Sequence, residues 1–216
     1  MNRIITGTMI DTETLALGGE ALIWELACVP FDIHLGGEAA EIVINDPLHA
    51  VLDLQGVDRS AFHIDQGTIG WTQNQRAGDP IWEGWRAAQL EGDGSLFSAD
   101  GVRLLKPAQL FEEIEARTGD WTPVWFRNSA FDAPRIDHLF EATLGKRTPW
   151  HRRQQSDIYT MSNLARQLTG YEDNRPAIAD HGALSDAVGQ IEQLADLTTE
   201  LQLGRLQPRG ELAPSI

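Results

Sequence analysis

The order of apolar runs along the chain constrains its fold most. Three short apolar runs lie at residues 3–10, 21–32 and 39–46, and the first is rich in β-branched residues. Runs of this composition and length predict β-strands. Glycine pairs at 18–19 and 36–37 lie between them and favour tight turns. Because strands joined by short turns pair antiparallel, we expect the chain to begin as a three-stranded antiparallel meander.

The second half of the sequence alternates helices with a strand. Residues 107–118 have apolar side chains at helical spacing, Pro107 at the start and Gly119 just past the end, so they predict a helix. An apolar run at 122–126 predicts a buried strand, and the helices expected after it begin near residues 132, 156 and 179. Strands that alternate with helices imply parallel additions to the meander. The predicted class is therefore α/β, with a mixed sheet covered by helices.

The length of 216 residues fits one domain, which we place at residues 1–204. Within it, residues 47–106 are predicted as an insertion of short helices and a glycine-rich loop, with Asp79 and Pro80 starting the second helix. Residues 205–216 are predicted as a loose C-terminal tail.

Composition limits the classes of partner and compartment. The formal net charge of -15 argues against binding nucleic acid by general electrostatic attraction, although the segment 146–153 collects four basic residues. Cys28 is the single cysteine, so no intrachain disulfide or cysteine metal site can form. The N-terminus lacks an apolar signal region and no run is long enough for a membrane span, so we expect a cytoplasmic protein without a membrane partner.

Carboxylates stand in unusual contexts at three points of the sequence. Asp11 and Glu13 follow the first apolar run and, two positions apart in an extended chain, emerge on one face. Asp132 follows the later strand, and His181 precedes Asp186 by five residues, which is an offset of about 140° in an ideal helix. Taken singly, each of these residues has a simpler interpretation. Asp11 and Glu13 could lie in a solvated turn, and Asp132 could cap a helix. His181 could be a surface histidine or one satisfied in the core.

Taken together, these side chains suggest phosphoryl chemistry. Several carboxylates without cysteine form the ligand set of hard cations, chiefly Mg²⁺ or Mn²⁺. Two such ions can stabilise both the attacking and the leaving oxygen of a phosphodiester displacement. A histidine has a suitable pKa to take the proton of the attacking water. We therefore hypothesise two-metal hydrolysis with His181 as the general base.

The segments "MIDTET", "NSAFDAPRI" and "HGALSDAV" resemble, in order, the three motifs of the DEDDh superfamily of 3'-to-5' exonucleases. The resemblance implies a ribonuclease-H-like fold with a five-stranded mixed sheet, three antiparallel strands and then parallel ones. It implies a metal-dependent exonuclease that releases 5'-mononucleotides from single-stranded 3' ends, with DNA slightly favoured over RNA. The residues matched to catalysis are Asp11, Glu13, Asp132, His181 and Asp186, with the four acids as ligands of two Mg²⁺ or Mn²⁺ ions.

The segment "GTIGWTQNQ" is similar to the "TxxWW" region of phage-type and exonuclease VIII-like enzymes, with Trp71 at the first aromatic position and Thr72 at the second. The expected substrate contacts are Thr12, Thr14, Leu15, Trp71, Asn128 and Phe131. Two alternatives stay open: a non-catalytic nucleic-acid-binding relative, and a phosphohydrolase of short oligonucleotides. The oligomeric state is also open, with a homodimer among the alternatives.

Overall fold

A long antiparallel hairpin forms the centre of the sheet. In the computed structural model, which describes residues 3–206 except 37–38, 93–95, 120 and 176–181, strand β1 (Arg3–Thr14) pairs with β2 (Ile23–Leu35). Strands β3 (Glu41–Ile44) and β4 (Leu48–Leu52) both pair antiparallel with β2, at different parts of its length. The predicted meander of β1, β2 and β3 is therefore confirmed.

Parallel strands extend the sheet at both sides. Strand β6 (Val124–Phe126) pairs parallel with β1, β7 (Gln155–Asp157) with β6, and β5 (Arg103–Leu105) with β4. The order is β5-β4-β2-β1-β6-β7, with β3 beside β2, which gives a seven-stranded mixed sheet in place of the five strands expected. Strands β5 and β7 are three residues long, too short for an alternating pattern to be read.

Residues 47–106 contribute more to the sheet than the sequence suggested, because β4 and β5 lie within them. The two expected short helices are present there, as α1 (Gln66–Gln75) and α2 (Pro80–Trp85). Asp79 caps α2 through its side chain, as predicted. A 3-10 turn η1 (Arg59–Ala61) precedes these helices, and a π-helical turn η2 (Arg86–Glu91) follows them.

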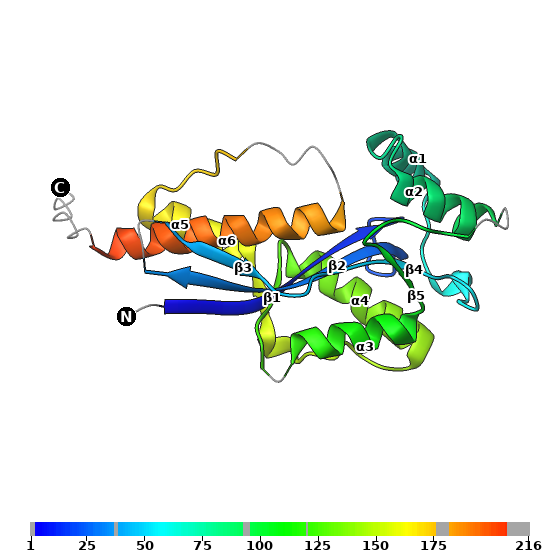
Figure 1. Ribbon diagram of the computed structural model, residues 1–216, viewed down its shortest axis with the longest axis horizontal. Helices are drawn as coiled ribbons and strands as arrows, with labels where there is room; N and C mark the ends of the chain where they lie inside the picture. The colour runs from blue at the N-terminus through cyan, green and yellow to red at the C-terminus, as the bar shows by residue number, and fades with distance from the viewer. Residues whose placement is uncertain (1–2, 37–38, 93–95, 120, 176–181, 207–216) are drawn as a thin grey trace, which may run out of the picture.

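Helices cover the two faces of the sheet (Figure 1). Helices α3 (Pro107–Thr118) and α4 (Ser129–Leu144) lie on one face, whereas α5 (Ile158–Thr169) and α6 (Ala183–Leu206) lie on the other. A further 3-10 turn, η3 (Arg152–Gln154), precedes β7. Each face has its own apolar core, one centred on Trp24, Trp82 and Trp85 and the other on the side chains of α6. The arrangement is consistent with a ribonuclease-H-like fold.

Two sequence details determine where helices begin. Helix α3 starts at Pro107 and ends before Gly119, as predicted. Helix α4 starts at Ser129, three residues earlier than expected, because the Asn128 side chain accepts the backbone N–H of Ala130. Asp132 therefore lies in the first turn of α4 and is not its cap.

Gly7 marks a close contact within the sheet. A Cβ at this position would come within 2.7 Å of Trp125 Cδ1 and 3.0 Å of Phe31 Cζ. Only glycine fits at this position without steric clash, because any side chain would displace the rings of Trp125 and Phe31.

Within the described part of the chain, no helix has both the length and the apolar character that crossing a membrane requires.

Candidate active site

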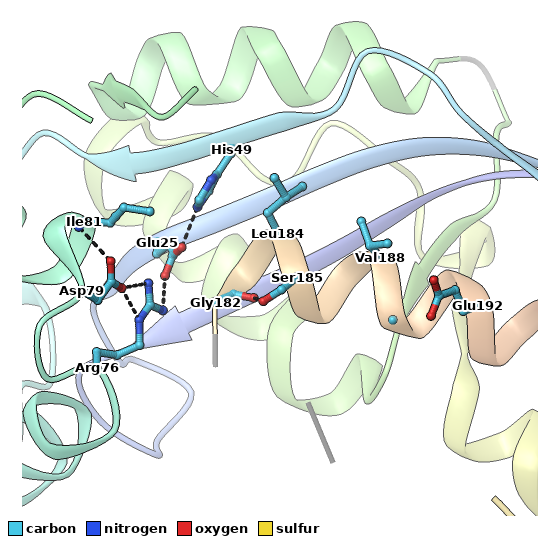
Figure 2. Close-up of a pocket in the computed structure, with 11 residues that line it drawn as sticks. Glu25, His49, Arg76, Asp79, Ile81, Gly182, Leu184, Ser185, Val188 and Glu192 are labelled. Atoms are coloured by element: carbon cyan, nitrogen blue, oxygen red, sulfur yellow. Dashed lines mark hydrogen bonds and ion pairs between the residues drawn. The ribbon is translucent and has the colours of Figure 1, made fainter. Parts of the chain in front are cut away.

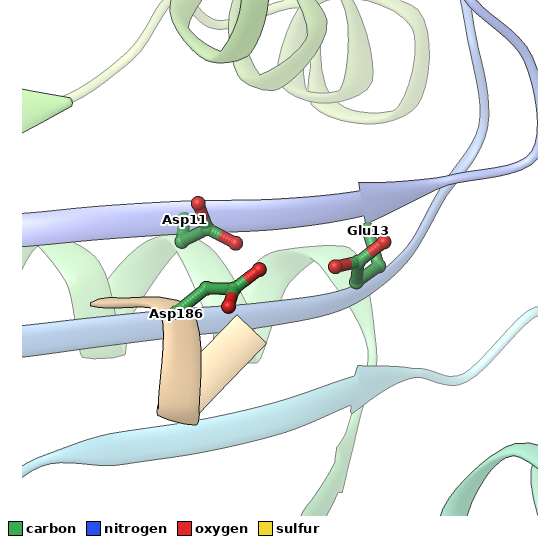
Figure 3. A group of neighbouring side chains, drawn as sticks. All are labelled: Asp11, Glu13 and Asp186. Atoms are coloured by element: carbon green, nitrogen blue, oxygen red, sulfur yellow. The ribbon is translucent and has the colours of Figure 1, made fainter. Parts of the chain in front are cut away.

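Three carboxylates from the two ends of the chain meet beside β1. Asp11 and Glu13 lie on the same face of β1, as the two-residue repeat of a strand requires, and Asp186 lies in the first turn of α6 (Figure 3). One carboxylate oxygen from each of the three lies within 4.8 Å of the others. Residues 175 positions apart in sequence are thereby brought into one small acidic cluster.

Asp132 approaches the same cluster from α4. Its Oδ1 accepts a hydrogen bond of 2.6 Å from the Thr12 hydroxyl, which fixes the carboxylate against β1. Asp132 lines the same cavity as Asp11, Glu13 and Asp186, although it is not among the three whose oxygens meet within 4.8 Å. All four acids matched to the exonuclease motifs therefore face one cavity.

Burial and mutual repulsion make the ionised form of these acids unfavourable. Burial raises the pKa of Glu13 to about 8, with further contributions from Glu25, Asp186 and Asp132 that outweigh the nearby Arg76. Burial likewise raises the pKa of Asp132 to about 6, despite the Thr12 hydrogen bond. The pKa of Asp11 is raised well above its ordinary value by burial and then by Asp132 and Glu13.

These observations fit a divalent cation. In the described ranges, Arg76 lowers the pKa of Glu13, but burial and the neighbouring acids outweigh it, and the causes that raise the pKa of Asp11 likewise outweigh its hydrogen bond from Gln190. Carboxylate oxygens are the donors that Mg²⁺ and Mn²⁺ prefer. A bound cation would also reverse the unfavourable ionisation, because it interacts with the charged form alone. Asp11, Glu13 and Asp186 could therefore hold a metal, with Asp132 available beside them.

Gln190 is a site residue that the sequence motifs did not identify. Its Nε2 donates a hydrogen bond of 2.7 Å to Asp11 Oδ1, and the side chain is 4% exposed. Its Oε1 is buried and has no hydrogen-bond partner in the part of the chain that the structure describes. The signal in the sequence is its position four residues after Asp186, which places both on one face of α6.

A buried charge network lies directly behind Glu13. Glu25 is the cross-strand partner of Glu13 in the β1–β2 register and is fully buried. Its carboxylate contacts Arg76 Nη1 at 2.9 Å and His49 Nε2 at 2.6 Å, and Arg76 also pairs with Asp79 (Figure 2). The Arg76 guanidinium lies within 3.7 Å of the position that a side-chain Cβ would occupy at Gly182, just before α6. The network thus connects β2, the end of α1 and the start of the helix that carries Asp186.

The cavity in front of the acids has a volume of about 600 Å³ and contains most of the predicted substrate contacts. Its lining includes these expected residues: Thr12, Thr14, Trp71, Asn128 and Phe131. Trp71 is 51% exposed, as an aromatic that contacts a ligand would be, while Trp82 and Trp85 are in the core. Asp65, which caps α1, also lines the cavity.

Leu15 does not line the cavity, contrary to the expectation that it contacts substrate. It is fully buried in the core, because β1 ends at Thr14 after a register shift and the alternation of side chains stops there. Leu17, which is 77% exposed, lines the cavity in its place.

His181, the predicted general base, lies outside the described residues. Its assignment rests on the third sequence motif and stays a prediction. The DEDDh superfamily and the phage-type subgroup are likewise predictions from sequence.

Comparison with protein families matches residues 6–198 to a family described as the 3'-5' exoribonuclease Rv2179c-like domain. Comparison with curated proteins found no match. The matched range covers nearly the whole sheet, both helical layers and all four acids that face the cavity. The chain therefore belongs to the Rv2179c-like family of 3'-5' exoribonuclease domains.

Proposed function

We propose that this protein is a metal-dependent 3'-to-5' exoribonuclease that releases nucleoside 5'-monophosphates from single-stranded RNA. One observation carries the proposal: the carboxylates of Asp11, Glu13 and Asp186 converge within 4.8 Å beside a cavity of about 600 Å³. The family description favours RNA over the DNA that the sequence resemblance slightly favoured. A cavity of this size is in the range of nucleotide-sized ligands.

Each group at the cavity has a role in this proposal. Asp11, Glu13 and Asp186 would hold the cations, of which we expect two, and Gln190 fixes the orientation of Asp11 through its hydrogen bond. When bound, Mg²⁺ or Mn²⁺ supplies a more acidic water and neutralises charge that develops on the phosphodiester. Asp132, which accepts a hydrogen bond from Thr12, adds a fourth carboxylate to the lining of the cavity.

The remaining groups are proposed to position the terminal nucleotide and to accept the proton of the attacking water. Trp71, Leu17 and Phe131 provide apolar surface on which a base can stack, an interaction that contributes roughly 1–3 kcal/mol per base. Asn128 can donate to a sugar or phosphate oxygen from the start of α4. His181 is proposed to accept the proton of the attacking water, and its replacement by alanine is expected to slow hydrolysis by about 100-fold or more.

Substitution of the acids tests the proposal. Asp11→Asn and Asp186→Asn should each reduce hydrolysis of a single-stranded RNA by at least about 100-fold, since each removes a charged ligand. Asp100→Asn is the matched control, because Asp100 is exposed and lies outside the cavity. Circular dichroism should show an unchanged fold in all three variants. Full activity of both site variants would exclude the acidic cluster as the catalytic centre.

The choice of substrate is tested in the same assay. Single-stranded RNA and DNA of one sequence are compared, each in Mn²⁺ and in EDTA. We expect faster hydrolysis of RNA, inhibition by EDTA and release of nucleoside 5'-monophosphates. Preference for DNA would contradict the substrate assignment, and activity in EDTA would contradict metal dependence.

A further inference from the structure

Two exposed arginines of this acidic protein, Arg147 and Arg152, lie together in the segment 146–153. Among the described residues, these arginines form ion pairs with carboxylates: Arg76, Arg86, Arg103, Arg117 and Arg175. Arg147 and Arg152 are exposed and form no ion pair with any of the residues that the structure describes. Their charge is therefore available to a ligand, in a chain whose formal net charge is -15.

These two arginines line a second cavity, of about 610 Å³, between α4 and the segment that leads to β7. Trp150 anchors this segment, since its side chain is 4% exposed and packs against Phe126. Asp137 is the one acid among the lining residues, and its Oδ1 already accepts the backbone N–H of Thr148. The cavity is thus predominantly basic and is built on an anchored loop.

The basic cavity and the acidic cavity share the N-terminal end of α4. Asn128, Phe131 and Asp132 line the acidic cavity. Ser129, Ala130 and Ala133, which are interspersed with them in sequence, line the basic cavity. At about 100° per residue these two sets lie on roughly opposite sides of the helix. A chain that leaves one cavity can reach the other by crossing the first turn of α4, where the helix dipole favours phosphate.

A third arginine lies on the side of the acidic cavity. Arg127 is the one basic residue among those that line it in the described structure, beside five acids. Its guanidinium lies over the ring of Tyr159, 5.8 Å from the centroid, and both side chains are exposed. Tyr159 follows β7, the strand to which the basic loop leads. Positive charge is therefore present in both cavities, from Arg127 in the acidic cavity and from Arg147 and Arg152 in the basic one.

We propose that the cavity of Arg147 and Arg152 binds the backbone phosphates of the RNA strand upstream of the 3' nucleotide. The strand passes from the acidic cavity across the start of α4, and the two guanidinium groups bind its phosphates there. This inference rests on the proposed exoribonuclease function and specifies its substrate as a strand longer than a dinucleotide. It also explains how a strongly acidic protein can bind a polyanion, because the positive charge is local.

Kinetics on two substrate lengths test this inference. A single-stranded RNA of about ten nucleotides is compared with a dinucleotide, for the wild type and for Arg147→Ala/Arg152→Ala. The matched control is Arg3→Ala/Arg166→Ala, which removes the same charge from exposed arginines outside both cavities. We call kcat/KM for the long strand divided by kcat/KM for the dinucleotide the length ratio. In the first variant we expect this ratio to fall about tenfold or more, because KM for the long strand rises. In the control variant we expect the ratio to stay unchanged. The slope of log KM against log salt should decrease by about 1.4, since each phosphate contact on a single strand contributes about 0.7.

The outcomes separate the two proposals. If the wild type hydrolyses neither RNA, the exoribonuclease function fails. If the wild type is active but the length ratio and the salt slope are the same in both double variants, the upstream binding site is wrong. If the wild type prefers the dinucleotide, the basic cavity does not serve the substrate and the protein acts on short oligonucleotides.

Discussion

Loss of Arg76 should destabilise the protein strongly, because it would leave a buried carboxylate with one partner. Glu25 is fully buried, and its oxygens contact Arg76 at 2.9 Å and His49 at 2.6 Å. Breaking a buried ion pair by removing one partner costs about 3–5 kcal/mol, since the remaining charge is not solvated. At roughly 2–4 °C per kcal/mol for a protein of this size, Arg76→Met should lower Tm by about 6–20 °C.

The control for this prediction is Arg103→Met. Arg103 pairs with Glu113 at 2.8 Å, but its side chain is 50% exposed, so the loss should not exceed about 1 kcal/mol. The double variant Glu25→Gln/Arg76→Met should recover part of the stability, because a neutral amide replaces the uncompensated charge. Thermal and urea denaturation measure all three. If Arg76→Met is no less stable than Arg103→Met, or the double variant recovers nothing, Glu25 is not held as a buried charge.

The remaining predictions concern titration, metal binding and packing. Because the pKa of Glu13 is raised from 4.5 to about 8, the folded protein holds more protons than the unfolded chain between these pH values, so in EDTA the free energy of unfolding should fall as pH rises through this range. Glu13→Gln should reduce that dependence, and an unchanged profile would contradict the assigned pKa. Mn²⁺ should raise Tm of the wild type but raise it less in Asp186→Asn, as measured by differential scanning fluorimetry; equal shifts would exclude Asp186 as a ligand. Gly7→Ala should cost about 1–3 kcal/mol through its clash with Trp125, whereas Gly70→Ala, in α1 with open space around it, should stabilise by about 0.5–1 kcal/mol; urea denaturation with the opposite order would refute the packing.

Local patterns made part of the fold predictable. The three apolar runs and their glycine turns specified the meander, and Pro107 and Gly119 specified α3, because each signal lies within the element itself. Strands β5 and β7 gave no such signal. They are three residues long, and β7 has the polar sequence Gln-Ser-Asp, so their pairing depends on the strands beside them.

The site was predictable to a similar extent. The two-residue repeat of a strand placed Asp11 and Glu13 on one face, whereas the approach of Asp132 and Asp186 was expected only from the resemblance to known motifs. Glu25 could not be placed opposite Glu13 without the β1–β2 register. Leu15 was misplaced because the end of β1 and its register shift cannot be read from local sequence.

The location of β1 inside the sheet has a consequence for motion at the active centre. Hydrogen bonds to β2 along its length and to β6 at Thr8 and Met9 hold this strand on both sides. Peptide amides in such interior strands exchange with solvent only in the rarest openings, which approach complete unfolding. Asp11 and Glu13 stand on this strand, where it stays paired with β2, so we expect their backbone segment to exchange deuterium slowly and the two carboxylates to keep their positions when substrate binds.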